Sequence, residues 1–310
     1  MRYPVNRPCP ITGEPAARTI AHVRAAVVAA ENQTYRDDYA ALLGISPEDE
    51  FPIVEGPTGF VYAGWLPPPG FLSRVYEDVI DHSKTVTTSL PYRHMLLEFG
   101  AAFQRVVLEQ GRPTPLRLLD FGCGYGALLR ILASHDIQAV GYEPSTQRRQ
   151  VNTADGDFTL LSDIDELERA GPFDLFVCTE VLEHVPEPRE VLRLLRRLAA
   201  PGALLGLTVP QCDLQALTHS FSEMERHGRL SPVINPWEHL NYFSSASLRR
   251  LLADEGFEII HDHGAGESFR QVANRVGTPQ GFTHRLLGAG RLARRAVRMM
   301  PSTQVFCRVA

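Results

Sequence analysis

The feature that most constrains the fold is a glycine-rich turn in the stretch LLDFGCGYGALL, residues 118–129. A short apolar run ends near Asp120, and three glycines follow at every second position: Gly122, Gly124 and Gly126. Glycine adopts positive φ without steric cost and lets the backbone approach a ligand closely. Such a turn between a buried strand and a helix also points helix N-terminal amides at the ligand. The sequence therefore predicts an α/β fold with a ligand site at this turn.

Strand and helix patterns alternate from about residue 90 onward. Apolar runs predict the strands, and periodic apolar positions predict the helices. The strands are expected at 116–120, 139–143, 158–161, 173–179, 203–209, 257–261 and 304–309. The helices are expected at 92–108, 127–134, 190–199, 247–255 and 285–300. This alternation predicts a parallel sheet with helices on both faces, a Rossmann-like doubly wound arrangement.

The first 80 residues follow a different pattern, because they are rich in proline and show no sustained periodicity. A helix at 16–30 and a short strand at 60–63 are the elements expected there. We therefore expect a small loop-rich N-terminal module over 1–80 and one large domain over 81–310. An insertion at 265–301, before the last strand, is expected to cover the substrate pocket or to form an oligomer contact.

Composition argues against several classes of protein. A net charge of -5 and a pI of about 6.1 disfavour a protein whose main task is binding nucleic acid. The chain lacks a run of about 18 apolar residues and begins without an apolar signal-peptide core, so neither a membrane span nor secretion is expected. The five cysteines are far apart and form no C-x-x-C pair, which favours a reduced, cytoplasmic setting.

The spacing of the glycines leaves two kinds of cofactor open. Gly122-x-Gly124-x-x-Ala127 satisfies the pattern of dinucleotide-binding turns. Glu143 lies 21 residues after Gly122, where such folds place an acid that binds ribose hydroxyls. On these facts an NAD(P)-dependent oxidoreductase is an alternative to an enzyme that uses S-adenosylmethionine.

Three further features favour S-adenosylmethionine. Asp120 would repel a pyrophosphate, whereas it suits the sulfonium and ammonium groups of a cationic cofactor. The third glycine falls at Gly126, which gives G-x-G-x-G. The fourth strand runs into an acidic segment with a histidine, FDLFVCTEVLEHVPEP, at 173–188.

The segments 118–129, 140–145 and 173–188 together resemble the class I S-adenosylmethionine-dependent methyltransferases in sequence, order and spacing. The similarity covers roughly 90–262. Within it, HLNYFSSASLRRLLADEGFEII at 239–260 is similar to a subgroup that methylates sugars and other small metabolites of the natural-product type. The resemblance implies a mostly parallel seven-stranded sheet whose last strand is antiparallel.

The resemblance also implies roles for single residues. Gly122, Gly124 and Gly126 would surround the methionine part of the cofactor. Asp120 would lie near the cofactor's ammonium group, and Glu143 would accept hydrogen bonds from both ribose hydroxyls.

Further along the chain, Asp163 and Ile164 resemble the pair that recognises adenine, with Asp163 accepting from the N6 amino group. A helix cap or a loop acid is the competing interpretation of Asp163. Thr179 and Glu180, just past the fourth strand, would line the methionine end of the cofactor and the mouth of the substrate pocket.

Methyl transfer from a sulfonium is an in-line displacement, so alignment alone supplies much of the catalysis. A base is needed when the acceptor loses a proton as it attacks. The candidates are Glu183, His184, His239 and Tyr242. Histidine titrates near neutrality, which favours the two histidines. For the Glu183-His184 pair, a role in the architecture of the pocket is the competing interpretation.

The segment Cys9-Pro10-Ile11-Thr12-Gly13 resembles the first knuckle of a zinc ribbon that opens many proteins of that subgroup. Thr12 stands where the second cysteine ligand would be. A structural zinc site needs about four ligands, and this module lacks the usual set. We therefore expect no metal site, and the module is interpreted as a metal-free ribbon remnant or as an unrelated proline-rich arm.

These features predict an enzyme that transfers a methyl group from S-adenosylmethionine to a small-molecule acceptor. A protein that binds the cofactor without catalysis, such as a partner subunit that has kept the fold, is the alternative outside the enzymes. A homodimer is one candidate assembly, and neither a nucleic-acid partner nor a membrane partner is expected.

Overall fold

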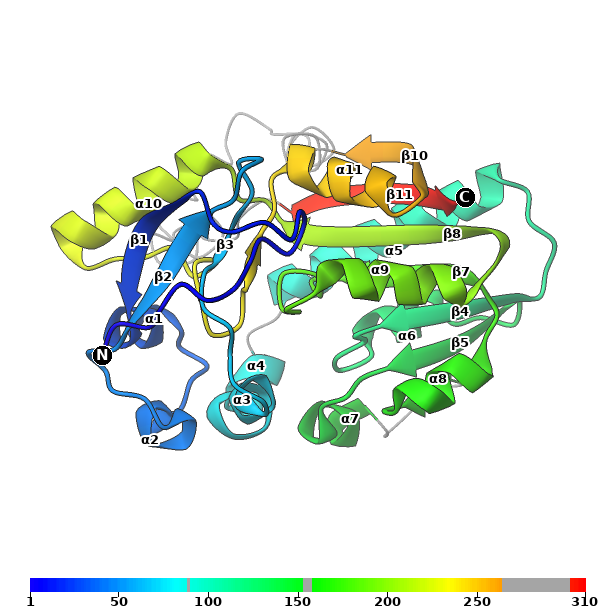
Figure 1. Cartoon of the computed structure of the whole chain (residues 1–310). Helices are drawn as coiled ribbons and strands as arrows, with labels where there is room; N and C mark the ends of the chain where they lie inside the picture. Colours follow the sequence, from blue (N-terminus) through cyan, green and yellow to red (C-terminus); the bar gives the residue numbers. More distant parts are fainter. Residues whose placement is uncertain (88–89, 153–157, 264–301) are drawn as a thin grey trace, which may run out of the picture.

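The computed structural model describes residues 1–87, 90–152, 158–263 and 302–310. Its larger unit is a seven-stranded sheet with the strand order β10-β11-β8-β7-β4-β5-β6 (Figure 1). The strands are β4 (Leu116–Phe121), β5 (Ile137–Tyr142), β6 (Phe158–Leu161), β7 (Phe173–Thr179), β8 (Ala199–Pro210), β10 (Phe257–His263) and β11 (Ser302–Val309). β4 is parallel to β5 and β7, whereas β11 is antiparallel to β8 and β10. The predicted sheet with an antiparallel last strand is confirmed.

Helices cover both faces of this sheet. They are α5 (Leu90–Glu109), α6 (Ala127–Leu132), α7 (Thr146–Asn152), α8 (Ile164–Ala170), α9 (Pro188–Arg197) and α11 (Ser245–Asp254). Successive residues of β4 point to opposite layers: Leu118 packs with residues of α5 and α6, and Leu119 packs with residues of α9 and α11. Because side chains alternate along a strand and both faces are covered, a central strand must be apolar throughout.

The N-terminal residues contain more regular structure than expected. They form an antiparallel sheet of order β1-β2-β3-β9, and its fourth strand comes from far along the chain. The elements are β1 (Arg18–Arg24), α1 (Ala25–Glu31), α2 (Tyr39–Leu43), β2 (Glu50–Glu55), β3 (Val61–Ala63), α3 (Phe71–Arg74), the π-helix η1 (Val75–Val79), α4 (His82–Thr87) and β9 (Asn241–Tyr242). The helix expected at 16–30 is wrong in its first half, which is β1. The strand expected at 60–63 is confirmed as β3.

A second apolar core joins the N-terminal sheet to the segment 212–242, which includes α10 (Leu214–His227). Phe51 of β2 lies 4.8 Å from the ring of Trp65 and 6.0 Å from the ring of Trp237, measured between centroids. Aromatic pairs at such distances contribute about 0.5–1.5 kcal/mol beyond the area that they bury. Residues from the two ends of the chain therefore share one core.

Two tight turns face each other beside this sheet. In the first, the Gly13 N–H donates to the carbonyl of Cys9 at 2.7 Å. In the second, the Gly59 N–H donates to the carbonyl of Gly56 at 3.0 Å. The turns are in close contact, since a Cβ on Gly56 would lie 3.0 Å from the sulfur of Cys9. This arrangement fits a metal-free ribbon remnant, which stays a prediction.

Arg7 connects the N-terminal module to the large sheet. Its side chain is buried, and the guanidinium donates to the carbonyl of Leu240 at 2.7 Å and to Oδ1 of Asn241 at 2.8 Å. It also donates to the carbonyl of Pro186, in the loop after β7. Burial lowers the pKa of Arg7 to about 10, so the group is still charged at neutral pH. Hydrogen bonds from a charged donor are roughly twice as strong as neutral ones.

The expected insertion at 265–301 and the helix expected at 285–300 lie outside the described residues. All five cysteines lie within them, and each is a buried free thiol. Among the described helices, none combines the length and the apolar character that a bilayer span requires.

Replacing Arg7 by methionine tests the importance of this connection. Arg7→Met keeps an unbranched side chain but removes the donor to Oδ1 of Asn241 and to the carbonyl of Pro186, whereas the carbonyl of Leu240 still accepts from the N–H of Ala63. We expect the free energy of unfolding to fall by about 2–4 kcal/mol in urea denaturation. The control is Arg24→Met, because Arg24 forms an exposed ion pair with Glu48 and such a pair contributes at most about 1 kcal/mol. Equal losses in the two variants would contradict the role assigned to Arg7.

Candidate active site

The glycine turn has the backbone conformation that its sequence predicts. Gly122, Gly124 and Gly126 have φ values of +76°, +53° and +68°, in the left-handed region that favours glycine. The N–H of Gly122 donates to the carbonyl of Tyr142 at 2.8 Å, which fixes the turn to the end of β5. A Cβ on Gly122 would lie 2.5 Å from a methyl group of Val181, whereas a Cβ on Gly124 would meet nothing within 4 Å. The turn is therefore packed at its first glycine and open at its second.

Asp120 lies beneath this turn at the end of β4. Its side chain is 1% exposed, and neither carboxylate oxygen has a hydrogen-bond partner among the described residues. Burial, together with the negative charge of Glu143, raises the pKa of Asp120 to about 8. A buried carboxyl group without a partner is costly, and an approaching cation would remove that cost. The site is thus suited to a ligand that carries positive charge.

Glu143 follows β5 and holds the turn from the other side. One carboxylate oxygen accepts from the N–H of Gly124 at 2.9 Å, and the other accepts from the N–H of Ser145 at 2.8 Å. Arg148 lies 3.9 Å away as a weaker ionic partner. Each oxygen has a second lone pair, so both can still accept from hydroxyl groups. This geometry agrees with the expected ribose contact, which stays a prediction.

Tyr76, in η1, is a residue of this region that the sequence did not indicate. Its ring lies under the guanidinium of Arg148, 4.7 Å from the ring centroid, and its hydroxyl lies 2.8 Å from Nδ1 of His184. His82 follows in α4, and its ring hydrogen-bonds to the hydroxyl of Tyr125 at 2.6 Å. The end of the N-terminal module therefore lies against both the glycine turn and the histidines. Only long-range contacts reveal this placement.

Asp163 is the N-cap of α8. One of its oxygens accepts from the N–H groups of Asp165 and Glu166, at 2.8 and 3.1 Å. Asp163 therefore acts as a helix cap, as the competing interpretation predicts. Its role in adenine recognition stays a prediction. Ile164 is partly buried against the main core.

Thr179 and Glu180 lie where β7 ends. Thr179 is buried, and Glu180 has a φ of +54°, unusual for a residue with a side chain. One oxygen of Glu180 accepts from the hydroxyls of Thr208 and Ser302, at 3.0 and 3.1 Å. Burial raises the pKa of Glu180. The strained backbone thus places a half-buried carboxyl group at the carboxyl edge of the sheet, where ligands bind in open α/β folds.

His184 and His239 face each other, with ring centroids 4.7 Å apart. Nδ1 of His184 lies 3.0 Å from the carbonyl of Glu238, and Nδ1 of His239 lies 2.7 Å from the carbonyl of Val233. A carbonyl can only accept, so donation to it puts the hydrogen on Nδ1 and leaves a lone pair on Nε2. For His184 this tautomer requires the hydroxyl of Tyr76, 2.8 Å from the same Nδ1, to accept from that N–H as well. The structure therefore brings together two of the predicted catalytic candidates.

Glu183 completes this group. It is 2% exposed, and neither of its oxygens has a hydrogen-bond partner among the described residues. Nε2 of His184 is 3.8 Å from one of them, too far for a hydrogen bond. Burial, and then the charge of Glu180, raises the pKa of Glu183 well above its usual value. Burial, and then His239, lowers the pKa of His184 well below its usual value.

The loop that carries these residues is held by Asn241 of β9. The amide nitrogen of Asn241 donates to the carbonyls of Leu182 and Val185 at 2.7 and 2.8 Å, and its oxygen accepts from Arg7. The N–H of Leu240 donates to the carbonyl of Glu183 at 2.6 Å. The strand that completes the N-terminal sheet thus also fixes the loop after β7.

Tyr242 is placed differently from the other candidates. It pairs with Val61 in the N-terminal sheet, and its hydroxyl is buried without a hydrogen-bond partner among the described residues. Burial raises the pKa of Tyr242 well above its usual value. These contacts favour packing over proton transfer for this residue.

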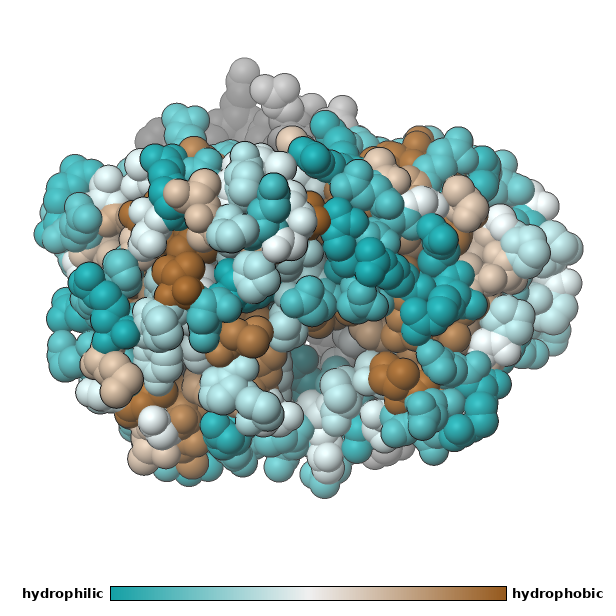
Figure 2. Space-filling view, viewed as in Figure 1, coloured by the Kyte–Doolittle hydropathy of each residue, from teal (hydrophilic) through white to brown (hydrophobic). Residues whose placement is uncertain are grey.

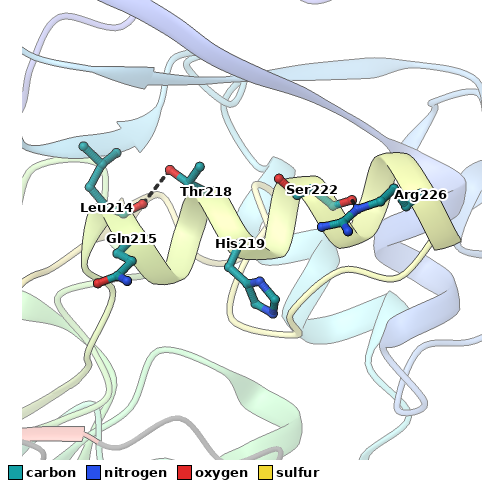
Figure 3. Close-up of a pocket in the computed structure, with 6 residues that line it drawn as sticks. All are labelled: Leu214, Gln215, Thr218, His219, Ser222 and Arg226. Atoms are coloured by element: carbon teal, nitrogen blue, oxygen red, sulfur yellow. Dashed lines mark hydrogen bonds between the residues drawn. The ribbon is translucent and has the colours of Figure 1, made fainter.

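Two of the hollows on the described part of the surface lie along elements near the sheet edge. In Figure 2 the surface is hollowed between the part that carries α3 and α4 and the part that carries α7 in Figure 1. The second is an open hollow of about 610 Å³ along α10, lined by Leu214, Gln215, Thr218, His219, Ser222 and Arg226 (Figure 3). Gln215 and His219 project from the same side of the helix. α10 begins four residues after the end of β8, so the second hollow starts near the carboxyl edge of the sheet.

The buried carboxyl group of Asp120 makes stability depend on pH. The folded chain keeps this proton up to a pH of about 8, whereas the unfolded chain loses it near 3.8. The unfolded state therefore binds fewer protons between these values, and stability falls as the pH rises through this window. Asp120→Asn should reduce that slope in urea denaturation at pH 5, 6.5 and 8. The exposed Asp136→Asn serves as the control and should keep the slope of the parent.

Comparison with known proteins agrees with this geometry. A family model described as "Methyltransferase domain" matches residues 92–262, more than half of the chain. The ubiquinone biosynthesis O-methyltransferase of Caulobacter sp. (strain K31) is 30% identical over 185 residues, which cover 52% of this chain and 66% of that protein. The protein of the same name from Leptothrix cholodnii is 23% identical over 163 residues, which cover 50% of this chain and 69% of that protein. These matches span about two thirds of the length of either relative.

Among solved structures, the plantazolicin methyltransferase BpumL in complex with S-adenosylhomocysteine has a TM-score of 0.50 and 14% identity. The match covers 77% of this chain and 94% of that chain, and it supports the fold. The family match sets aside the NAD(P)-dependent oxidoreductase. The open glycine turn, the unpaired acid beneath it and the matched segment lead to one assignment: the chain belongs to the methyltransferase-domain family and carries a class I S-adenosylmethionine-dependent methyltransferase domain.

Proposed function

We propose that this protein transfers the methyl group of S-adenosylmethionine to a hydroxyl group of a small-molecule acceptor. The observation that supports this most directly is the pairing of two features at one sheet edge. Asp120 and the open side of Gly124 suit a cationic cofactor. Glu183, His184 and His239 lie past the adjacent strand β7, where an acceptor would meet it.

The reaction needs alignment and the removal of one proton. The acceptor oxygen attacks the methyl carbon as the bond from carbon to sulfur breaks, and the sulfonium becomes a thioether. Nε2 of His184 lies 3.8 Å from an oxygen of Glu183, and a ring nitrogen of His239 lies within 4.8 Å of both residues, so His184 and His239 are the proposed general bases. The names of the Caulobacter and Leptothrix relatives describe O-methyltransferases, which supports oxygen as the acceptor atom.

The substrate class is drawn from the side chains past β7. A carboxyl group and two imidazoles within 4.8 Å of one another suit a polar small molecule that carries hydroxyl groups. An aromatic intermediate like those of quinone biosynthesis and a sugar or other natural-product intermediate both fit this description. We further propose a cytoplasmic location. We also propose a homodimer, and light scattering of the purified chain will measure the mass of the assembly.

Cofactor binding has a matched pair of variants. Gly124 and Gly111 both have positive φ, +53° and +58°, and a Cβ on either would meet nothing within 4 Å. Gly124→Ala and Gly111→Ala therefore impose similar backbone strain, but only the first puts a methyl group into the proposed cofactor space. We expect calorimetry with S-adenosylhomocysteine to show one site per chain. The affinity should fall by roughly tenfold or more in Gly124→Ala and should stay unchanged in Gly111→Ala. Binding of NAD in place of the adenosyl compound would refute the cofactor assignment.

Catalysis is tested separately from binding. A screen of small phenols, catechols and sugars, followed by release of S-adenosylhomocysteine, should find an acceptor for the parent protein. His184→Ala and His239→Ala should lower turnover while leaving affinity for S-adenosylhomocysteine unchanged. Tight cofactor binding without turnover on any acceptor would favour the non-catalytic alternative.

A further inference from the structure

The acceptor side of the site contains a buried carboxyl group, that of Glu183, which accepts from no described N–H or alcohol O–H and whose neighbour is the carboxyl group of Glu180. Glu183 is 2% exposed, and both of its oxygens are without such a donor among the described residues. Buried polar atoms are nearly always paired, so an unpaired buried carboxyl group suggests a missing partner. One oxygen of Glu183, one ring nitrogen of His184 and one ring nitrogen of His239 all lie within 4.8 Å of one another.

The two histidines are already oriented as ligands. Each Nδ1–H is used by a backbone carbonyl, of Glu238 for His184 and of Val233 for His239. Each Nε2 is therefore left with its lone pair. Imidazoles that bind metals commonly donate their other N–H to a carbonyl or a carboxylate, which fixes both the tautomer and the orientation of the ring. The hydroxyl of Tyr76 lies 2.8 Å from Nδ1 of His184, and in this tautomer it accepts from the same N–H, which the two oxygens share.

We propose that Glu183, His184 and His239 bind one divalent transition-metal cation. Two imidazole nitrogens with a carboxylate oxygen suit Zn²⁺, Mn²⁺, Co²⁺ or Fe²⁺ and leave coordination positions open for other ligands. Calcium is disfavoured, because it takes oxygen ligands. The half-buried carboxyl group of Glu180 interacts with that of Glu183 and supplies further negative charge to offset the cation.

Glu180 and Glu183 interact through their side chains, so without a cation the two carboxyl groups share a proton. A divalent cation bound by Glu183 would displace that proton and would offset the repulsion between the two carboxylates. Cys9 and the turns of the N-terminal module are not part of the proposed site. The metal-free ribbon and the proposed cation concern different places: the ribbon lacks zinc ligands around Cys9, and the cation would be held by Glu183 with the two histidines.

The proposed role rests on the proposed methyl transfer. A cation here would bind the acceptor oxygen and favour its deprotonated form, with the proton released to solvent. An acceptor with two adjacent oxygens, such as a catechol or a vicinal diol, could bind through both. A bound cation would thus take over the proton removal proposed above for the two histidines: His184 and His239 would hold the cation, and they would act as direct bases only in a chain without metal.

Metal binding is measured without any acceptor or cofactor. The full chain is stripped with a chelator, dialysed and titrated with Mn²⁺, Co²⁺ and Zn²⁺ by calorimetry. We expect one saturable site per chain, and for Co²⁺ visible bands without a charge-transfer band from a thiolate. His184→Ala, His239→Ala and Glu183→Gln should each weaken affinity by at least about tenfold, since even loss of an outer partner costs that much. His135→Ala, which removes a fully exposed histidine, should bind as the parent does.

Spectroscopy of the parent protein keeps the proposal testable if a variant does not fold. Electron paramagnetic resonance of the Cu²⁺ form should show coupling to two imidazole nitrogens. The proposal is overturned if no saturable site exists, if the coupling is absent, or if folded variants bind like the parent. Failure of methyl transfer with intact metal binding would count against the proposed function alone. Methyl transfer that survives the chelator in a chain that binds no metal would count against the metal site alone.

Discussion

The hydrogen bonds of the buried Asn241 side chain determine how the two parts of this protein meet. Its amide nitrogen holds the carbonyls of Leu182 and Val185, and its oxygen accepts from the charged Arg7. The loop after β7 is irregular, so its carbonyls need partners outside the strand ladder. The side chains of Asn241 and Arg7 supply them for Leu182, Val185 and Pro186, and backbone N–H groups of Leu240 and Asn241 supply them for Glu183. The sheet alone does not fix the positions of Glu183 and His184, because these residues lie in the loop that Asn241 and Arg7 hold.

The cofactor side and the acceptor side are built by different means. The glycine turn is a local structure, fixed by positive φ values and by hydrogen bonds to the neighbouring strand. The acceptor side combines a loop after β7, the segment around His239 and the residue Tyr76 of the N-terminal module. The first depends on residues close together in the sequence, and the second depends on the way distant segments pack.

This difference explains what the sequence could predict. The strands of the large sheet were predictable because each is a short apolar run buried on both faces, and Asp120, Gly122 and Glu143 follow from their places at the ends of strands. The N-terminal sheet was missed because β2 contains Pro52 and because β9 has only two residues. The helix expected at 16–30 failed in its first half, where pairing with β2 overrides local helix preference.

The candidate site was predicted in part for the same reason. His184 and His239 were expected near the substrate, but nothing in the spacing between them showed that their rings would be 4.7 Å apart. Arg7, Tyr76 and Asn241 could not be found, because each acts through contacts with residues more than 50 positions away. Asp163 was found but its role was not determined, since a helix-capping acid and a ligand-binding acid look alike in sequence.

The strand β9 has a consequence for any attempt to simplify the molecule. A fragment that began after the N-terminal sheet would retain the family's matched segment, 92–262. It would also leave the backbone of β9 as an unpaired edge and the apolar side of α10 facing water. Unpaired edges and uncovered apolar faces promote aggregation. The smallest folding unit of this protein is therefore larger than the segment that its relatives share with it.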